Sequence, residues 1–179
     1  MTGTPDPTTS AAGDGGPDAL DQFAGITADS PLGQLRAQQP AAVSAAQGSY
    51  LALLEPDDPG GVSRYEREAI ALRVAVLTPS EPVADWHRER LRALGVTDAA
   101  LAAIEQFPAG PALAPRETAI LQHTDLLTLN PGAATAAHLA ELQAAGLSPR
   151  DIVTISQLIA LVSYQVRVLV GLRLLAEEA

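Results

Sequence analysis

Proline, glycine and polar capping residues divide this chain into helix-length segments, and no segment alternates apolar and polar residues as a strand would. Breaker clusters at 55–61 and 130–132 separate stretches rich in Ala, Leu, Val and Ile. These features predict an all-α protein that folds as a compact helical bundle. The expected helices cover approximately residues 20–26, 32–40, 41–54, 63–77, 78–94, 98–105, 115–127, 133–145 and 149–177.

Polar residues at the predicted helix starts give further detail. Ser63 and Glu66 have the spacing of a capping box. Thr78 and Glu81 repeat that spacing, although Pro82 in the same turn favours a later start, at Ser80. Periodicity within 41–54 predicts four buried side chains, namely Val43, Tyr50, Leu51 and Leu54.

Length and composition suggest a tail followed by one domain. The chain has 179 residues, which is enough to bury a substantial core. Residues 1–17 are mainly Thr, Pro, Gly, Asp and Ala, so we expect a disordered tail there. Residues 18–179 are expected to form a single helical domain. The first ten residues lack the basic and apolar regions of a signal peptide, and we expect a cytoplasmic protein.

Charge and the absence of cysteine exclude several kinds of function. The net charge of -10 predicts repulsion from nucleic acids and from anionic membrane surfaces. The apolar run 152–166 is shorter than the ~20 residues that span a bilayer, so a buried helix is the expected structure. Because the chain contains no cysteine, it has neither a thiolate nucleophile nor a disulfide.

Two segments of the sequence resemble each other. Five positions, His87, Leu91, Gly95, Thr97 and Leu101, match His138, Leu142, Gly146, Ser148 and Ile152 at a constant offset of 51 residues. Residues 67–70 also resemble 116–120, at an offset near 49. We expect an internally repeated helical hairpin whose two copies pack against each other, because neither copy can bury its apolar stripe alone.

Glu68 and His87 are the strongest candidates for chemistry. They lie on two consecutive predicted helices, and an antiparallel hairpin would direct both side chains into one interior space. A carboxylate that orients an imidazole forms a workable proton relay near neutral pH. The alternative is purely structural, with Glu68 a solvated helix residue and His87 an ordinary core or surface histidine.

Other polar side chains have both a functional and a structural interpretation. Trp86 is either a hydrophobic anchor or a pocket wall that binds substrate. Arg167 lies in an apolar helix, so it either pairs with an interior carboxylate such as Glu68 or binds an anionic substrate. His123 and His138 lack the spacing of a metal-binding motif, and we expect no metal site.

The sequence from Glu68 to His87 resembles a known family. Glu68, Ser80, Val83 and His87 reproduce the spacing Glu-x11-Cys-x2-Cys-x3-His of alkylhydroperoxidase D-like proteins in the carboxymuconolactone decarboxylase superfamily. The flanking helices, and a second half that includes 126–132 and 163–167, are also similar to that family. The resemblance covers roughly residues 47–175 and implies the family's helical fold, commonly assembled as a homo-oligomer.

The resemblance also implies a change of activity. Family peroxidases reduce peroxide with two cysteines, but Ser80 and Val83 stand at those positions here, so peroxidase chemistry is disfavoured. We expect no cofactor. The favoured hypothesis is an acid/base enzyme, of decarboxylase or isomerase type, acting on a small organic acid or lactone through Glu68 and His87. Trp86, Arg167 and Ser80 would bind the substrate. The alternative is a non-catalytic oligomeric or partner subunit.

Overall fold

The structure is a computed structural model that describes residues 18–177, and every regular element in that range is helical. The all-α prediction is confirmed, whereas the predicted disordered tail lies outside the described residues. The α-helices are α1 (Ala19–Ala24), α2 (Pro31–Ala37), α3 (Pro40–Leu54), α4 (Arg64–Leu77), α5 (Glu81–Ala93), α6 (Asp98–Glu105), α7 (Pro115–Leu129), α8 (Ala136–Ala144) and α9 (Pro149–Glu177). A short 3-10 helix, η1 (Pro131–Ala133), precedes α8.

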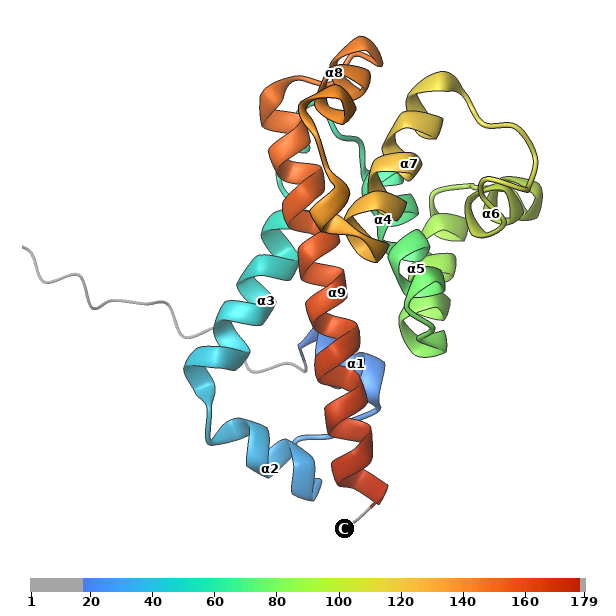
Figure 1. Cartoon of the computed structure of the whole chain (residues 1–179). Coiled ribbons are helices and arrows are strands. Elements are labelled where there is room, and N and C mark those ends of the chain that lie inside the picture. The colour runs from blue at the N-terminus through green and yellow to red at the C-terminus, as the bar shows by residue number, and fades with distance from the viewer. Residues whose placement is uncertain (1–17, 178–179) are drawn as a thin grey trace, which may run out of the picture.

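The long helix α9 is the axis of the molecule (Figure 1). It packs against α4 and α7 along one part of its length and against α1 and α3 along another. Leu158, Ile159 and Val162 in its middle are buried in the core. By length and composition alone α9 could cross a membrane, a property that core helices share. Helices α4 and α5 form the closely packed hairpin that carries the candidate site.

Local capping decides where these helices begin. The Ser63 capping box is confirmed, since Ser63 Oγ accepts the N–H of Glu66 and the Glu66 carboxylate accepts the N–H of Ser63. The capping box predicted at Thr78 is wrong. Thr78 instead ends α4, and α5 begins after Ser80, because the backbone turns there before Pro82 enters the first turn.

Two of the four core positions predicted on α3 are not buried. Leu51 is 45% exposed and Val43 is only partly buried, whereas Tyr50 and Leu54 are buried. Helix α3 lies at one side of the molecule, and only one of its faces contacts α4 and α9 (Figure 1). An apolar side chain next to that face therefore has no partner to cover it.

The internal repeat is visible in corresponding helix ends. Gly95 and Gly146, 51 residues apart, both follow their helices with positive φ angles of 83° and 87°. Glycine adopts this backbone conformation without the steric cost that a Cβ would bring. Thr97 then caps α6, and Ser148 accepts the N–H of Asp151 at the start of α9. The α4–α6 segment and the segment from α7 into α9 are thus two copies of one arrangement.

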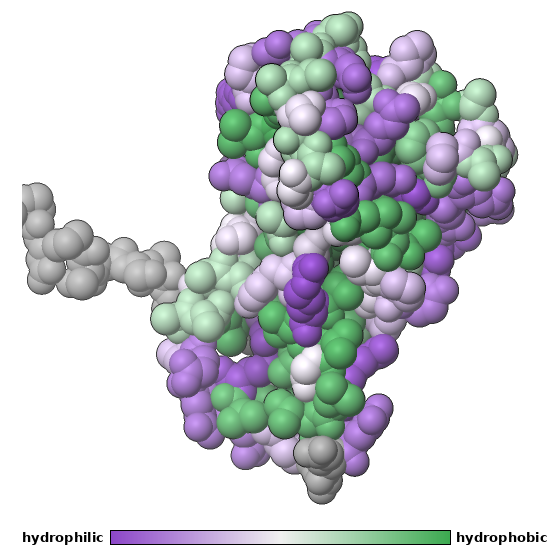
Figure 2. Space-filling model, in the orientation of Figure 1, coloured by the Kyte–Doolittle hydropathy of each residue, from purple (hydrophilic) through white to green (hydrophobic). Residues whose placement is uncertain are grey.

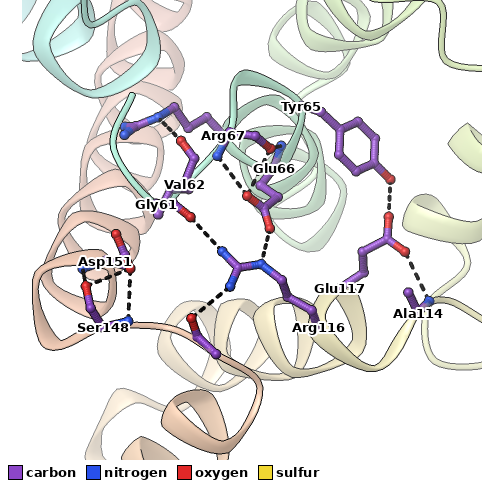
Figure 3. Close-up of polar contacts among 12 residues, drawn as sticks. Gly61, Val62, Tyr65, Glu66, Arg67, Ala114, Arg116, Glu117, Ser148 and Asp151 are labelled. Atoms are coloured by element: carbon purple, nitrogen blue, oxygen red, sulfur yellow. Dashed lines mark hydrogen bonds and ion pairs between the residues drawn. The ribbon is translucent and has the colours of Figure 1, made fainter. Parts of the chain in front are cut away.

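The two copies are linked by reciprocal contacts at equivalent positions (Figure 3). Tyr65 donates its hydroxyl to Glu117 at 2.6 Å, while Arg116 donates to Glu66 at 2.6 Å. Positions 65 and 116 are equivalent at the offset of 51, and so are 66 and 117. Each repeat therefore contacts the other through the same two positions, as expected for an approximate two-fold axis between α4 and α7.

This register corrects the offset near 49 that sequence matching gave for the first helix of the repeat. Glu66 and Glu117 occupy the third position of their helices, and both carboxylates accept a capping backbone N–H. The offset is therefore 51 throughout, and the residue equivalent to Glu68 is Ala119 rather than Glu117. The offset of 49 arose because the dipeptide Arg-Glu occurs in both helices at positions that are not equivalent, 67–68 in α4 and 116–117 in α7.

Candidate active site

Glu68 and His87 meet in the interior of the α4–α5 hairpin. Glu68 is 2% exposed and His87 is completely buried. The Nδ1 atom of His87 lies 2.6 Å from Oε2 of Glu68. The hairpin geometry expected from the sequence is therefore present, and the interpretation of Glu68 as a solvated helix residue is wrong.

The hydrogen bond fixes the protonation pattern of the ring. An ionised carboxylate only accepts hydrogen bonds, so Nδ1 of His87 carries the proton that is donated to Glu68. In the neutral ring the other nitrogen, Nε2, then presents a lone pair. It is buried and has no hydrogen-bond partner among the described residues. A buried polar atom without a partner costs about 1–3 kcal/mol, so its retention points to a use other than stability.

Arg90 holds the other side of the carboxylate. Its Nε lies 2.6 Å from Oε1 of Glu68, and one of its terminal nitrogens lies 2.6 Å from Glu55. Burial alone would raise the pKa of Glu68, but the hydrogen bonds and charges of His87 and Arg90 outweigh it, and the pKa is lowered. Glu68 is therefore ionised near neutral pH.

A second layer of side chains fixes these groups in place. Trp86 donates its indole N–H to the Tyr50 hydroxyl at 3.1 Å, and Arg90 stacks over the indole ring at 5.9 Å. Burial raises the pKa of Tyr50 to about 12, so its phenol keeps its proton. Trp86 is half-buried and packs beside the site, although its predicted role in substrate binding remains a prediction.

Helix α1 covers the imidazole. The Phe23 ring stands edge-on to Trp86 at 5.5 Å and tilts against His87 at 6.3 Å. Leu20 and Phe23 are both buried, and α1 packs on α5 and α9. Two cavities are described within residues 18–177, and His87 lines neither of them. The His87 ring is thus enclosed in this conformation.

The positions that carry cysteines in the related peroxidases lie at the start of α5. Ser80 precedes the first turn and is 8% exposed, but its hydroxyl does not cap the helix. Val83 lies one turn later and is completely buried. A hydroxyl and an isopropyl group have no accessible redox chemistry, so this pair provides no route for thiol-based peroxide reduction.

Arg167 does not pair with Glu68, and its role in substrate binding remains a prediction. It is exposed, and its guanidinium donates to the Ser163 carbonyl of the same helix at 2.7 Å. The expected pairing with Glu68 is wrong, because His87 and Arg90 occupy both carboxylate oxygens. Among residues 18–177, no cluster of three or more His, Asp or Glu side chains could hold a metal ion.

Two important neighbours of the site were missed from the sequence. Arg90 is three residues after His87 and so shares its helix face, a spacing that could have suggested the contact with Glu68. Phe23 reaches the site from a helix more than sixty positions earlier in the chain. Because no local pattern connects Phe23 to His87, only the tertiary structure reveals this contact.

The fold and site together define a class: an all-α domain with a repeated helical hairpin that buries a glutamate–histidine pair. The family model described as the carboxymuconolactone decarboxylase family matches residues 40–126, which include Glu68, Ser80, Val83 and His87. Residues 40–126 of this chain are therefore similar to the carboxymuconolactone decarboxylase family.

Comparison with solved structures supports the same fold. A crystal structure of a protein of unknown function from Agrobacterium tumefaciens, described as a candidate antioxidant defence protein AhpD, aligns with a TM-score of 0.66. The two chains are 22% identical, and the alignment covers 78% of this chain and 92% of the other. At this level of identity the likeness shows the fold alone. The search of curated proteins finds no match.

Proposed function

We propose that this domain is an acid/base enzyme without thiol chemistry, acting on a small organic acid or lactone. The observation that carries the proposal is the buried Glu68–His87 pair, whose free nitrogen, Nε2, has no protein partner among the described residues. The match to the family model supports it, since the matched segment includes the relay positions that the sequence resemblance identified.

In this mechanism Nε2 of His87 is the atom that moves the proton. It removes a proton from an acidic carbon of the substrate while Nδ1–H remains bonded to Glu68. The ionised Glu68 stabilises the imidazolium that forms, and Arg90 keeps Glu68 ionised. In an isomerisation the imidazolium then returns the proton to another carbon. In a decarboxylation the cycle begins with the imidazolium instead: the bond between carbon and the carboxylate breaks, CO2 departs, and Nε2–H protonates the carbanion that is left, after which the ring takes up a proton from water.

Substrate access requires α1 to move. Phe23 packs against His87 and Trp86, so a substrate must replace that ring to reach Nε2. Helix α1 has only six residues. Arg36 forms ion pairs with the N-cap Asp18 at 2.5 Å and with Asp21 at 2.6 Å, and the Ala19 N–H donates to Gln47 at 3.0 Å. Opening must break these polar contacts and the packing of α1 on α5 and α9, but it leaves the α4–α9 core in place.

The test is a proton-exchange assay in D2O with a panel of small unsaturated acids, β-keto acids and lactones, followed by 1H NMR. We expect at least one substrate to be exchanged, isomerised or decarboxylated. His87→Gln should lower its rate by about 100-fold or more, the usual contribution of a general base. His138→Gln, at the equivalent position of the second repeat, is the matched control. Undiminished turnover by His87→Gln would remove His87 from the mechanism.

The second candidate is a non-catalytic subunit that assembles with further copies of this chain. Large apolar side chains of α9, including Tyr164, Val170, Leu174 and Leu175, are exposed. Apolar surface also follows the C-terminal half of α9 in Figure 2. Burying such a surface drives association. Sedimentation of the full chain tests this candidate: a dimer or larger species that Leu174→Glu disrupts supports it, and a monomer refutes it.

A further inference from the structure

The second repeat contains a cavity of about 270 Å3 between α7 and α8. Ala119, Leu126 and Leu142 contribute its apolar wall. Four polar residues complete the lining, namely Gln122, His123, His138 and Glu141. The volume is just below the ~300–1,000 Å3 typical of ligand pockets. It is large enough for a molecule of one small ring with a substituent.

The repeat relates this cavity to the Glu68–His87 site. At the offset of 51, His138 is equivalent to His87 and Ala119 is equivalent to Glu68. In the first repeat the Glu68 carboxylate fills the space between the two helices and bonds to His87. In the second repeat Ala119 has only a methyl group, so the corresponding space remains open beside His138.

His123 lines the cavity and has an unused hydrogen-bond acceptor buried behind the cavity wall. The Ser156 hydroxyl donates to the Ile152 carbonyl at 2.8 Å, so its oxygen is left to accept the Nε2–H of His123 at 3.4 Å. The lone pair of His123 is therefore on Nδ1, which is buried and has no partner among the described residues. Burial lowers the pKa of His123 and so favours the neutral ring.

His138 provides the cavity with a hydrogen-bond donor. Its Nδ1 accepts the Thr135 backbone N–H at 3.0 Å, so the neutral ring carries its proton on Nε2. A protonated Nε2 cannot bind a metal ion, which agrees with the lack of a three-ligand cluster in the described part of the chain. No lysine or arginine lines the cavity within residues 18–177, and Glu141 contributes negative charge. An anionic ligand would therefore find no counter-charge.

We propose that the cavity between α7 and α8 is a second small-molecule site, which takes an uncharged molecule with a compact apolar body and one hydroxyl group. The hydroxyl accepts from Nε2–H of His138, and it donates to Nδ1 of His123 once the His123 ring turns to expose that buried atom. The apolar body packs against Ala119, Leu126 and Leu142. This site is separate from His87 and does not depend on the proposed catalytic activity.

Benzyl alcohol, benzylamine and benzoate are suitable probes, because they share one ring and differ in charge. Each is titrated into the full-length chain labelled with 15N-histidine, and the imidazole resonances are followed by NMR. Benzyl alcohol should shift His123 and His138 saturably at millimolar concentration and leave His87 unchanged. Benzylamine and benzoate should bind at least tenfold more weakly, since each would bury an uncompensated charge.

Two variants locate the site. Ala119→Met fills the cavity and should abolish the saturable shifts, whereas Leu139→Ala, on the exposed side of α8, should leave the affinity unchanged. His123→Leu removes the acceptor and should weaken binding by roughly tenfold. The proposal is overturned if benzyl alcohol produces no saturable shift, if Ala119→Met still binds it, or if benzoate or benzylamine binds as tightly.

Discussion

Replacing Glu68 by glutamine tests the electrostatics of the buried pair most sharply. The amide oxygen can still accept from Nδ1 of His87, but its NH2 group then faces the Nε–H of Arg90, which now lies 2.6 Å from Glu68. One buried donor loses its partner, and one charge-assisted hydrogen bond is lost. The expected loss of stability at pH 7 is about 2–3 kcal/mol, the usual range for such a change.

The sign of the pH dependence follows from the pKa of Glu68, which is lower in the folded protein than its ordinary value of 4.5. A lowered folded pKa contributes stability above the unfolded pKa and loses it as pH falls through the folded pKa. The difference between Glu68→Gln and the parent chain should therefore be full at pH 7. It should shrink as the pH falls below about 4.5.

Urea denaturation followed by circular dichroism at 222 nm measures this difference. With a slope of about 2 kcal/mol per molar, Glu68→Gln should lower the urea midpoint by roughly 1 M at pH 7. The matched control is Glu89→Gln, which removes the same charge at an exposed position of α5 and should change stability by less than about 0.5 kcal/mol. Equal midpoints for Glu68→Gln and the parent at pH 7, or an undiminished difference in acid, would refute the reasoning.

Three further substitutions probe the lid, the core and the repeat. Phe23→Ala should make His87 reactive toward diethyl pyrocarbonate, because the ring that covers the imidazole is removed. Peptide mass spectrometry detects the modified histidine, and continued protection of His87 would show that Phe23 does not enclose it. Asp125→Ala removes both 2.7 Å contacts to the buried Arg73 and should cost about 3 kcal/mol in thermal or urea unfolding, and a neutral effect would contradict this. Gly146→Ala introduces a Cβ at a φ of 87° and should lower the free energy of unfolding by about 1 kcal/mol. A variant of equal or greater stability would show that a side chain is not strained in this backbone conformation.

Much of the fold could be predicted because its signals are local. Breaker clusters, capping residues and apolar periodicity each act within one or two helical turns, so helices such as α4, α6 and α9 begin close to the predicted residues. The predictions that failed concern positions whose conformation or burial depends on tertiary contacts. The capping box at Thr78 failed because the backbone turns after α4, although the later start at Ser80 is confirmed. The exposure of Leu51 depended on which face of α3 finds a partner.

The candidate site could be predicted only in part, for the same reason. The Glu68–His87 contact followed from two helices joined by a short turn, which restricts them to an antiparallel hairpin. Arg167 was misplaced because its helix is apolar on several sides, so the sequence did not show which face points outward. The closure of the site by Phe23 depends on a contact between distant segments.

The central claim is that Glu68 fixes the His87 ring with its proton on Nδ1 and a free lone pair on Nε2. Long-range 1H–15N NMR correlation of the histidine side chains measures this tautomer directly. The account predicts that neutral His87 is protonated on Nδ1 and that Glu68→Gln perturbs that resonance. A neutral ring with its proton on Nε2, unaffected by Glu68→Gln, would contradict it.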